Sequence, residues 1–306
     1  MTPPSPQNPG LTNWLYVTAL GIIWGAAFML TGLSLEGFGP WTVAAGRTLI
    51  GGLALWTVGS ALGQGLGSLP SPRAIAFASI IGLIATALPF ALLSWGLQFV
   101  PTAFAGVSMA TIPLLILPLV AIFSKEEGIG PRRIIGFTLG FIGLLILIGP
   151  DALSQDSGPM AFWGGLACFG AAGSYACGSI ITRRAPKMPP LAFATMSLFV
   201  ASVALVPVAL YLEGLPESYP AGPTAALLAT AFLPTALAAV IRVRVITTAG
   251  SLFMSLTSYQ VPVWSVIFGM TLMGEALPPH LFGALALILT GIAISQSRAL
   301  AQALRR

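Results

Sequence analysis

Two matching stretches of the chain determine how the rest of it is interpreted. Residues 104–127 read FAGVSMATIPLLILPLVAIFSKEE, and residues 253–276 read FMSLTSYQVPVWSVIFGMTLMGEA. They align without a gap at an offset of 149 positions, and the alignment pairs uncommon residue types: Phe104 with Phe253, Pro113 with Pro262, and Glu126 with Glu275. Chance produces many Ala and Leu matches in an apolar chain, but rarely gapless matches of proline and glutamate. The chain is therefore predicted to contain an internal duplication.

The same offset extends over the rest of the chain. It pairs further glycines, prolines and one tripeptide: Gly21 with Gly170, Pro40 with Pro189, and the sequence TAL at 86–88 with TAL at 235–237. The duplication therefore covers nearly the whole sequence.

The composition is that of a membrane protein. Apolar residues make up 56% of the 306 residues and charged residues 7%, with a mean hydropathy of +0.93. Soluble domains carry roughly 25% charged residues, whereas one bilayer crossing takes about 20 apolar residues. Ten apolar stretches of about this length follow one another: 14–34, 40–62, 74–99, 102–123, 133–149, 160–182, 190–212, 223–248, 250–273 and 280–298. Because lipid does not tolerate unpaired strand edges, we expect an all-α protein with ten transmembrane helices. They form two five-helix repeats, and the odd number per repeat requires the second to be inverted.

The charged residues predict how the chain is oriented. Ten of the thirteen basic residues fall in even-numbered loops or the C-terminal tail: Arg73, Lys125, Arg132, Arg133, Arg183, Arg184, Lys187, Arg298, Arg305 and Arg306. The odd-numbered loops carry acids and no Lys or Arg: Glu36, Asp151, Asp156, Glu213, Glu217 and Glu275. Short loops rich in Lys and Arg stay cytoplasmic, so both termini of this multi-pass membrane protein are predicted to be cytoplasmic; the resemblance described below implies the inner (plasma) membrane.

The chain is predicted to have four parts. The Pro-rich, uncharged N-terminus at 1–13 is expected to be disordered and cytoplasmic, without the basic start of a cleavable signal. The two repeats occupy 14–150 and 160–298, and a basic cytoplasmic tail follows at 299–306.

Several function classes are excluded by the residue types present. The net charge of +5 does not indicate a nucleic-acid partner, because the basic residues form no dense run. One histidine, His280, and two cysteines, Cys168 and Cys177, cannot build a metal centre. The cysteines are about 13 Å apart along one helix, too far for a disulfide, and both are expected to pack. With no Asp in any span and no nucleophile elbow, we expect no enzyme and no cofactor. A membrane receptor or structural protein is the alternative class, but neither explains an inverted duplication.

The arrangement of these features resembles a known family. In each half a helix with a central proline is followed thirteen residues later by a glutamate and then by a glycine-rich last helix. The opening helix carries Trp24-Gly25 and Phe28, and the second helix carries Arg47. Over residues 14–298 this pattern resembles the EamA-type exporters of the drug/metabolite transporter superfamily. Within that superfamily the chain is most similar to exporters of amino acids, including aromatic ones.

The chain departs from the family pattern at two places. The first half reads Lys125-Glu126-Glu127 where Gly-Glu is usual, and the second half has Gly173-Ser174 where the opening helix should carry Trp-Gly. The second departure indicates that the two halves contact substrate unequally.

Pro113 and Pro262 are candidate hinges. Each lies in the middle of a predicted helix and frees the carbonyl four residues earlier, on Met109 and Ser258. A static kink is the alternative, because membrane helices tolerate one.

Aromatic and polar residues near these prolines are candidates for a substrate cavity between the halves. Gln260 and Trp264 share a helix face at four-residue spacing, and an amide beside an aromatic ring suits an amphipathic organic solute. The predicted binding set places similar side chains on four helices: Trp24, Ser94, Trp95, Gln98, Tyr175, Ser179, Tyr259, Gln260 and Trp264. For the hydroxyl residues, interhelical hydrogen bonding is the alternative.

Three arginines lie within predicted spans, where a charge is costly and indicates function or pairing. Arg242 and Arg244 are near the predicted cytoplasmic end of their helix, so they either reach water there or bind a substrate carboxylate. Arg47, seven residues from the start of its span, has the same two interpretations. Arg242 and Arg244 complete the predicted binding set.

The sequence thus predicts a transporter that exports small organic metabolites, amino acids including aromatic ones, by alternating access. Nucleosides, sugars or amphipathic drugs are the alternative cargo. Its partners are this small molecule and the lipid bilayer; the oligomeric state stays open, and a monomer is compatible with the repeats. Glu126 and Glu275, at helix ends, are expected to be solvated or paired with basic residues rather than to carry protons.

Overall fold

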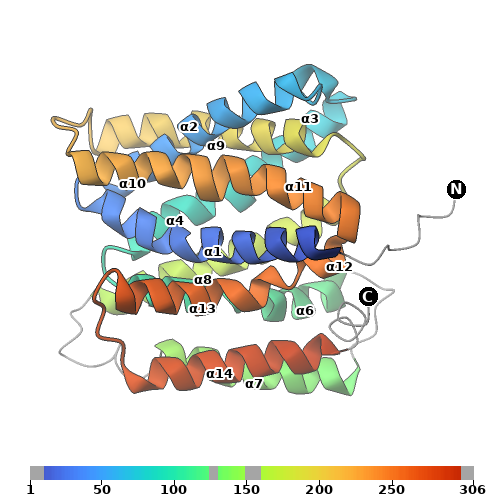
Figure 1. The fold of residues 1–306 in the computed structure, drawn as a ribbon, viewed down its shortest axis with the longest axis vertical. Helices are drawn as coiled ribbons and strands as arrows, with labels where there is room; N and C mark the ends of the chain where they lie inside the picture. The colour runs from blue at the N-terminus through green and yellow to red at the C-terminus, as the bar shows by residue number, and fades with distance from the viewer. Residues whose placement is uncertain (1–9, 124–129, 149–159, 298–306) are drawn as a thin grey trace, which may run out of the picture.

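The computed structural model describes residues 10–123, 130–148 and 160–297, and every regular element in these ranges is helical. The helices lie side by side along one direction (Figure 1). In chain order they are α1 (Gly10–Leu35), α2 (Pro40–Ala61), η1 (Leu66–Ser68), α3 (Pro72–Gly82), η2 (Leu83–Ala87), α4 (Leu88–Gly96), α5 (Thr102–Met109), α6 (Ile112–Phe123), α7 (Pro131–Ile148), α8 (Ala161–Arg183), α9 (Pro190–Leu212), α10 (Ala221–Ala231), η4 (Phe232–Leu237), α11 (Ala238–Ala249), α12 (Ser251–Met254), α13 (Thr257–Thr271) and α14 (Pro279–Ser295).

The helical segments coincide with the predicted spans, and their ends differ by no more than four residues. The largest difference is at α1, which begins at Gly10 because no proline follows Pro9 before the apolar stretch. Six segments are long and apolar enough to cross a membrane, and two further apolar helices are shorter. The described part of the chain is therefore an all-helical, multi-pass membrane fold. The full count of ten crossings stays a prediction.

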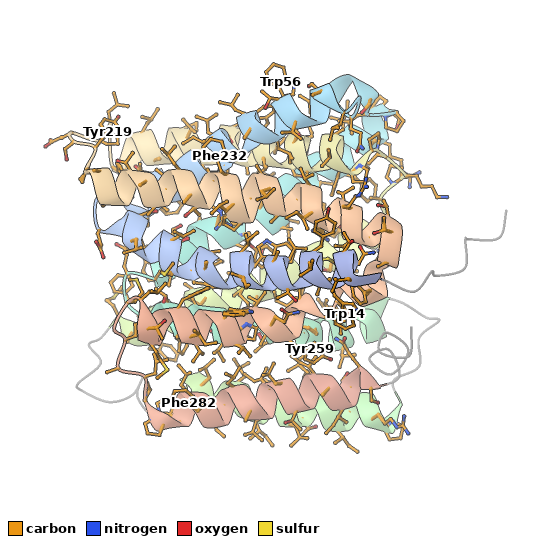
Figure 2. The ribbon with its side chains drawn as sticks, viewed as in Figure 1. Trp14, Trp56, Tyr219, Phe232, Tyr259 and Phe282 are labelled. Atoms are coloured by element: carbon orange, nitrogen blue, oxygen red, sulfur yellow. The ribbon has the colours of Figure 1, made fainter. Side chains whose placement is uncertain are left out.

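The surface around the helices is apolar. Trp56, Phe232 and Phe282, labelled in Figure 2, are 44%, 48% and 41% exposed. Soluble monomers rarely expose extended apolar patches, so this surface suits lipid.

The described loops separate by charge between the two ends of the bundle. One end, which we call the acidic end, carries Glu36, Glu213, Glu217 and Glu275, and the other, the basic end, carries Arg73, Arg183, Arg184 and Lys187. This separation is what the loop charges predicted. Which end faces the cytoplasm stays a prediction.

Helices of the two halves are interleaved. α7 packs along α14 at one edge of the bundle, and α2 packs along α9 toward the other (Figure 1). Between these pairs, α1 packs against α13 and α10, and α8 packs against α4 and α6. Every one of these contacts joins a helix of the first half to a helix of the second, so any central site is shared by both.

Small residues and helical phase decide which side chains pack. A Cβ at Gly136 or Gly143 would collide with a carbonyl of α14, so glycine allows α7 and α14 to approach closely. On α8, Cys168 is buried but Cys177 is exposed. The expectation that both cysteines pack was wrong for Cys177, because nine residues are two and a half helical turns and place the two on opposite faces.

Candidate functional site

The third helical segment of each half contains a π-helical turn at the same place. η2 begins at Leu83 and η4 begins at Phe232, 149 positions apart. A π-turn interrupts the regular ladder of backbone hydrogen bonds, and such turns are frequent at functional sites. Both halves therefore contribute one irregular backbone segment at matching positions.

Each π-turn is held by a side chain from the first helix of the other half. Trp24 Nε1 on α1 donates to the Pro234 carbonyl of η4 at 3.2 Å. The Ser174 hydroxyl on α8 donates to the Ile84 carbonyl of η2. Ser174 follows Gly173, the residue that matches Trp24, so a neighbouring hydroxyl does in the second half what the indole does in the first. The two halves interlock through this pair of contacts, which we call the central interlock.

Gln260 and Trp264 lie on one face of α13, as predicted, and that face packs on α1. A Cβ placed at Gly21 would lie 2.7 Å from Gln260 Cβ, and one at Gly25 would lie 2.5 Å from Trp264 Cβ. Both side chains are half-buried, and the ring centroids of Trp264 and Phe268 are 5.8 Å apart in a stacked pair. The glycines of α1 are therefore what lets these two large side chains reach the interface.

The structure gathers only part of the predicted binding set at the centre. Trp24 contacts η4, and Tyr175 packs against the cluster of buried residues that contains Phe90 and Ala236. Tyr259 instead packs with residues of α5, α7 and α14, and its buried hydroxyl has no hydrogen-bond partner among the described residues.

Ser94 and Trp95 lie in the last turn of α4, and Gln98 follows two residues after its end. Trp95 and Phe99 meet edge to face, with ring centroids 5.0 Å apart. The Gln98 side chain is exposed, and its amide donates to the Trp95 carbonyl at 3.1 Å. Ser179, on α8, donates to the Tyr175 carbonyl of its own helix at 2.9 Å. The alternative of interhelical bonding was wrong for Ser179, because a serine satisfies its hydroxyl within one helical turn.

The two prolines are not equivalent in the structure. α5 ends at Met109 and α6 begins at Ile112, so Pro113 occupies the first turn of a new helix, where its missing amide costs little. Pro262 does lie inside its helix, α13. The predicted mid-helix position of Pro113 is therefore corrected, since a turn two residues earlier already interrupts the helix.

Of the three intramembrane arginines, Arg47 is the buried one. It is 8% exposed, its Nε donates to Thr235 Oγ1 at 3.0 Å, and its guanidinium carbon lies 3.8 Å from the Phe90 ring centroid. Arg242 and Arg244 are both exposed on α11. The binding set predicted from sequence included these two and omitted Arg47, although its position within a span was a usable signal. Nothing in the sequence marked Phe90 as a candidate site residue.

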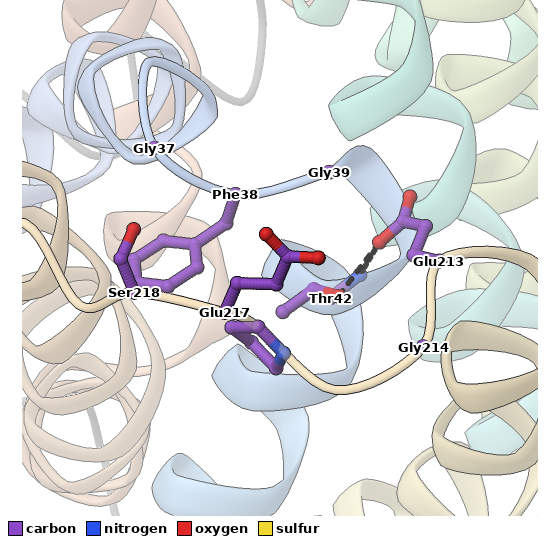
Figure 3. Close-up of a pocket in the computed structure, with 9 residues that line it drawn as sticks. Gly37, Phe38, Gly39, Thr42, Glu213, Gly214, Glu217 and Ser218 are labelled. Atoms are coloured by element: carbon purple, nitrogen blue, oxygen red, sulfur yellow. Dashed lines mark hydrogen bonds between the residues drawn. The ribbon is translucent and has the colours of Figure 1, made fainter.

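At the acidic end, a carboxylate joins the two halves. Glu213, the C-cap residue of α9, accepts hydrogen bonds from the backbone amides of Trp41 and Thr42 at 2.9 and 2.8 Å. It also accepts one from the Thr42 hydroxyl at 2.6 Å (Figure 3). A carboxylate is unfavourable at a helix C-terminus and favourable at a helix N-terminus. Glu213 is therefore stabilised by α2 rather than by its own helix.

A pocket of about 230 Å³ adjoins this contact. It is lined by the loops around Phe38 and Glu217 (Figure 3) and contains no residue of the predicted binding set. It is a depression between loops at the acidic end, remote from the central interlock.

Glu275 makes the same kind of contact on a second helix. Its carboxylate accepts hydrogen bonds from the amides of Thr102 at 2.5 Å and Ala103 at 3.1 Å, which begin α5. Solvent or a basic partner was expected for Glu275, and the partners are instead two orphan amides of a helix N-terminus. Its match Glu126 lies outside the described residues.

Comparison with known proteins agrees with this arrangement. The EamA-like transporter family matches the chain twice, over residues 12–149 and 162–296, which confirms the predicted duplication. The uncharacterized inner membrane transporter YedA of Escherichia coli K12 is 28% identical over 191 residues, 61% of this chain. Its counterparts in Escherichia coli O6:H1 and O157:H7 match to the same extent. The match spans 58% of the length of these relatives.

A solved crystal structure of a protein has the same overall arrangement. It superposes with a TM-score of 0.65 at 25% sequence identity, covering 94% of this chain and 98% of the other. The fold therefore extends over nearly all of both chains.

Proposed function

The chain belongs to the EamA-like transporter family, and from this premise we propose that it exports small organic metabolites by alternating access. We propose amino acids, including aromatic ones, as the cargo. The observation that carries this proposal is the central interlock, in which α1 holds η4 and α8 holds η2. Inverted-repeat transporters place their substrate where irregular backbone from both repeats meets.

A difference between the two halves supports alternating access. The break in the first half separates Met109 from Ile112, and the break in the second separates Met254 from Thr257. At the 149-residue offset, the first break corresponds to positions inside α13 and the second to positions inside α5. Because the two repeats share one sequence pattern, each could adopt the helix break that the other now has. Such an exchange would close one end of the bundle and open the other.

Half-buried aromatic side chains favour amino acids and aromatic ones in particular. Trp24, Tyr175 and Trp264 are all half-buried, and aromatic rings with a few polar groups suit an amphipathic solute. Nucleosides, sugars and amphipathic drugs are the alternative cargo. Because Glu275 is engaged by two backbone amides, we further propose that the solute's own gradient drives flux.

The charge of the loops supports placing the basic end in the cytoplasm. A cysteine replacing the exposed Glu217, in a Cys177→Ser background, should react with an impermeant thiol reagent added outside cells. Labelling only after permeabilisation would reverse this orientation.

The central test is exchange by purified protein in liposomes, against a panel of amino acids, nucleosides, sugars and a cationic drug. Gln260→Ala and Trp264→Ala should each lower amino-acid exchange at least about tenfold while the yield of monodisperse protein is kept. Trp56→Ala is the matched control, because this tryptophan is 44% exposed on the outer surface. Exchange of no solute in the panel would refute the proposed function, and normal exchange by both α13 variants would remove that face from the site.

A further inference from the structure

The buried cation Arg47 has contacts that fix its position. Its Nε donates to Thr235 Oγ1 at 3.0 Å, and the hydroxyl of Thr235 in turn donates to the Thr230 carbonyl at 2.9 Å. Because its proton is used in this second bond, the Thr235 oxygen is oriented to accept from Arg47. One face of the guanidinium is covered by Phe90, at 3.8 Å from the ring centroid. The side chain is therefore held in one plane before any ligand arrives.

This cation has no anionic partner in the part of the chain that the structure describes. There it donates to Thr235 and lies over the Phe90 ring, and it makes no ion pair with a described residue. The four acids that the structure describes, Glu36, Glu213, Glu217 and Glu275, lie at helix ends or in loops. A buried charge without a counterion is strongly unfavourable in a membrane protein, and by default indicates a function.

Two donors of Arg47 are not used by the protein. Within the described residues, its two terminal nitrogens make no hydrogen bond, although the residue is only 8% exposed. The hydroxyl of Tyr175 likewise makes no hydrogen bond with a described residue, and its half-buried side chain packs against the same cluster of buried residues that contains Phe90.

We propose that Arg47 and Tyr175 bind the carboxylate of the transported solute, so that the cargo is a carboxylate-bearing metabolite. With Nε bonded to Thr235 and one face on Phe90, the guanidinium presents its two terminal nitrogens as a fork. A planar fork matches the two oxygens of a carboxylate, and the Tyr175 hydroxyl supplies a third donor. This inference rests on the proposed function and names the chemical group that the carrier selects.

Charge and symmetry narrow the ligand further. A single cation balances a carboxylate, whereas a phosphate near neutral pH carries about −1.5 to −2 and would need a second cation. The second half offers no equivalent, because the positions that match Arg47 and Phe90 hold Met196 and Ala239. There is accordingly one carboxylate site per molecule, formed by α2, α4, α8 and η4.

The experiment compares an amino acid with its isosteric amide, which lacks the carboxylate charge. Liposomes that contain the protein exchange labelled phenylalanine, and unlabelled phenylalanine or phenylalanine amide is added as the competitor. Wild-type protein should prefer the acid at least about tenfold, the effect expected of hydrogen bonds to a charged group. Arg47→Gln should reduce this preference to about twofold or less, and Arg47→Lys should keep part of it because it retains a point charge. Met196→Gln, at the matching position of the second half, should leave the preference unchanged.

A second readout does not depend on flux. Phenylalanine should raise the thermal stability of wild-type protein in detergent more than the amide does, and this difference should disappear in Arg47→Gln. If that variant is not recovered folded, Tyr175→Phe decides, with an expected loss of about threefold or more in acid preference.

The outcomes separate this inference from the function it rests on. Exchange of no solute by the wild-type protein refutes the proposed function. Exchange of amino acids without preference for the acid, or an unchanged preference in Arg47→Gln, overturns the carboxylate site alone. Exchange of sugars or nucleosides only overturns both the carboxylate site and the proposed amino-acid cargo, but not the transport function.

Discussion

The helices α2 and α9 occupy matching places in the two halves, but their N-termini are held very differently. At the acidic end, Glu213 accepts three hydrogen bonds from Trp41 and Thr42, at 2.6 to 2.9 Å. At the basic end, the matching residue Gln64 accepts one, from the Leu191 amide at 3.3 Å. We call these the acidic cap and the basic cap.

Three sequence differences explain the contrast. Gln64 carries no charge, Pro190 has no amide where Trp41 has one, and Leu191 has no hydroxyl where Thr42 has one. Hydrogen bonds to an ionised acceptor are roughly twice as strong as neutral ones. The described conformation therefore holds the N-terminus of α2 more firmly than that of α9. Opening the acidic end is expected to require loss of the acidic cap.

Removing the acidic cap should have the largest effect. Glu213→Ala leaves two amides of α2 without their acceptor and should lower the stability of the protein in detergent by about 2 kcal/mol. Gln64→Ala should lower the stability by well under half of that amount. The measurement is thermal or denaturant unfolding, with the exposed Glu217→Ala as control because it lines the same pocket without capping a helix.

The same variant tests whether the cap closes the acidic end. Phe38 is 7% exposed beside the capped helix, so Phe38→Cys in a Cys177→Ser background should react slowly with a thiol reagent. Adding Glu213→Ala should speed this reaction several-fold. Equal rates would mean that the cap stabilises α2 without closing that end.

Neutralising the second carboxylate at the acidic end should have a smaller effect. Glu275→Gln keeps one acceptor for the amides of Thr102 and Ala103 but loses the charge, so we expect a loss of about 1 kcal/mol. The exposed Glu36→Gln is the control for charge alone. A stability loss that depends on salt equally in both variants would attribute the effect to general electrostatics rather than to the cap.

Making the two caps alike should reduce the contrast. Gln64→Glu puts a carboxylate at the N-terminus of α9 and should stabilise the protein by about 0.5 kcal/mol, because one amide and the helix dipole are available there. The gain should shrink at high salt. No gain at low salt would show that the basic cap is too far from the helix axis to benefit.

At the centre, in contrast to the ends, the two halves should respond equally. Trp24→Phe and Ser174→Ala each remove one hydrogen bond of the central interlock, and each should cost about 0.6 kcal/mol, the average for such bonds in membranes. Unfolding of the two variants side by side provides the measurement. A clear difference between them would show that the halves are not equivalent at the centre either.

The sequence by itself determined the limits of the described helical segments and their duplication. A bilayer requires uninterrupted apolar runs of about 20 residues, and the chain marks the ends of these runs with proline, glycine and charge. The structure reproduces those limits to within four residues. The gapless match of Pro113 with Pro262 and of Glu126 with Glu275 was sufficient to find the repeat.

The tertiary structure alone decided which side chains meet. Helices α1 and α2, which carry Trp24 and Arg47, have no polar face opposite an apolar one, so periodicity gives no direction for either side chain. The contacts of Trp24 with Pro234, of Arg47 with Thr235 and of Glu213 with Thr42 each join residues more than 150 positions apart. They depend on how each helix is rotated about its axis. That rotation is set by close packing between the interleaved halves. It cannot be predicted from the sequence pattern of one helix alone.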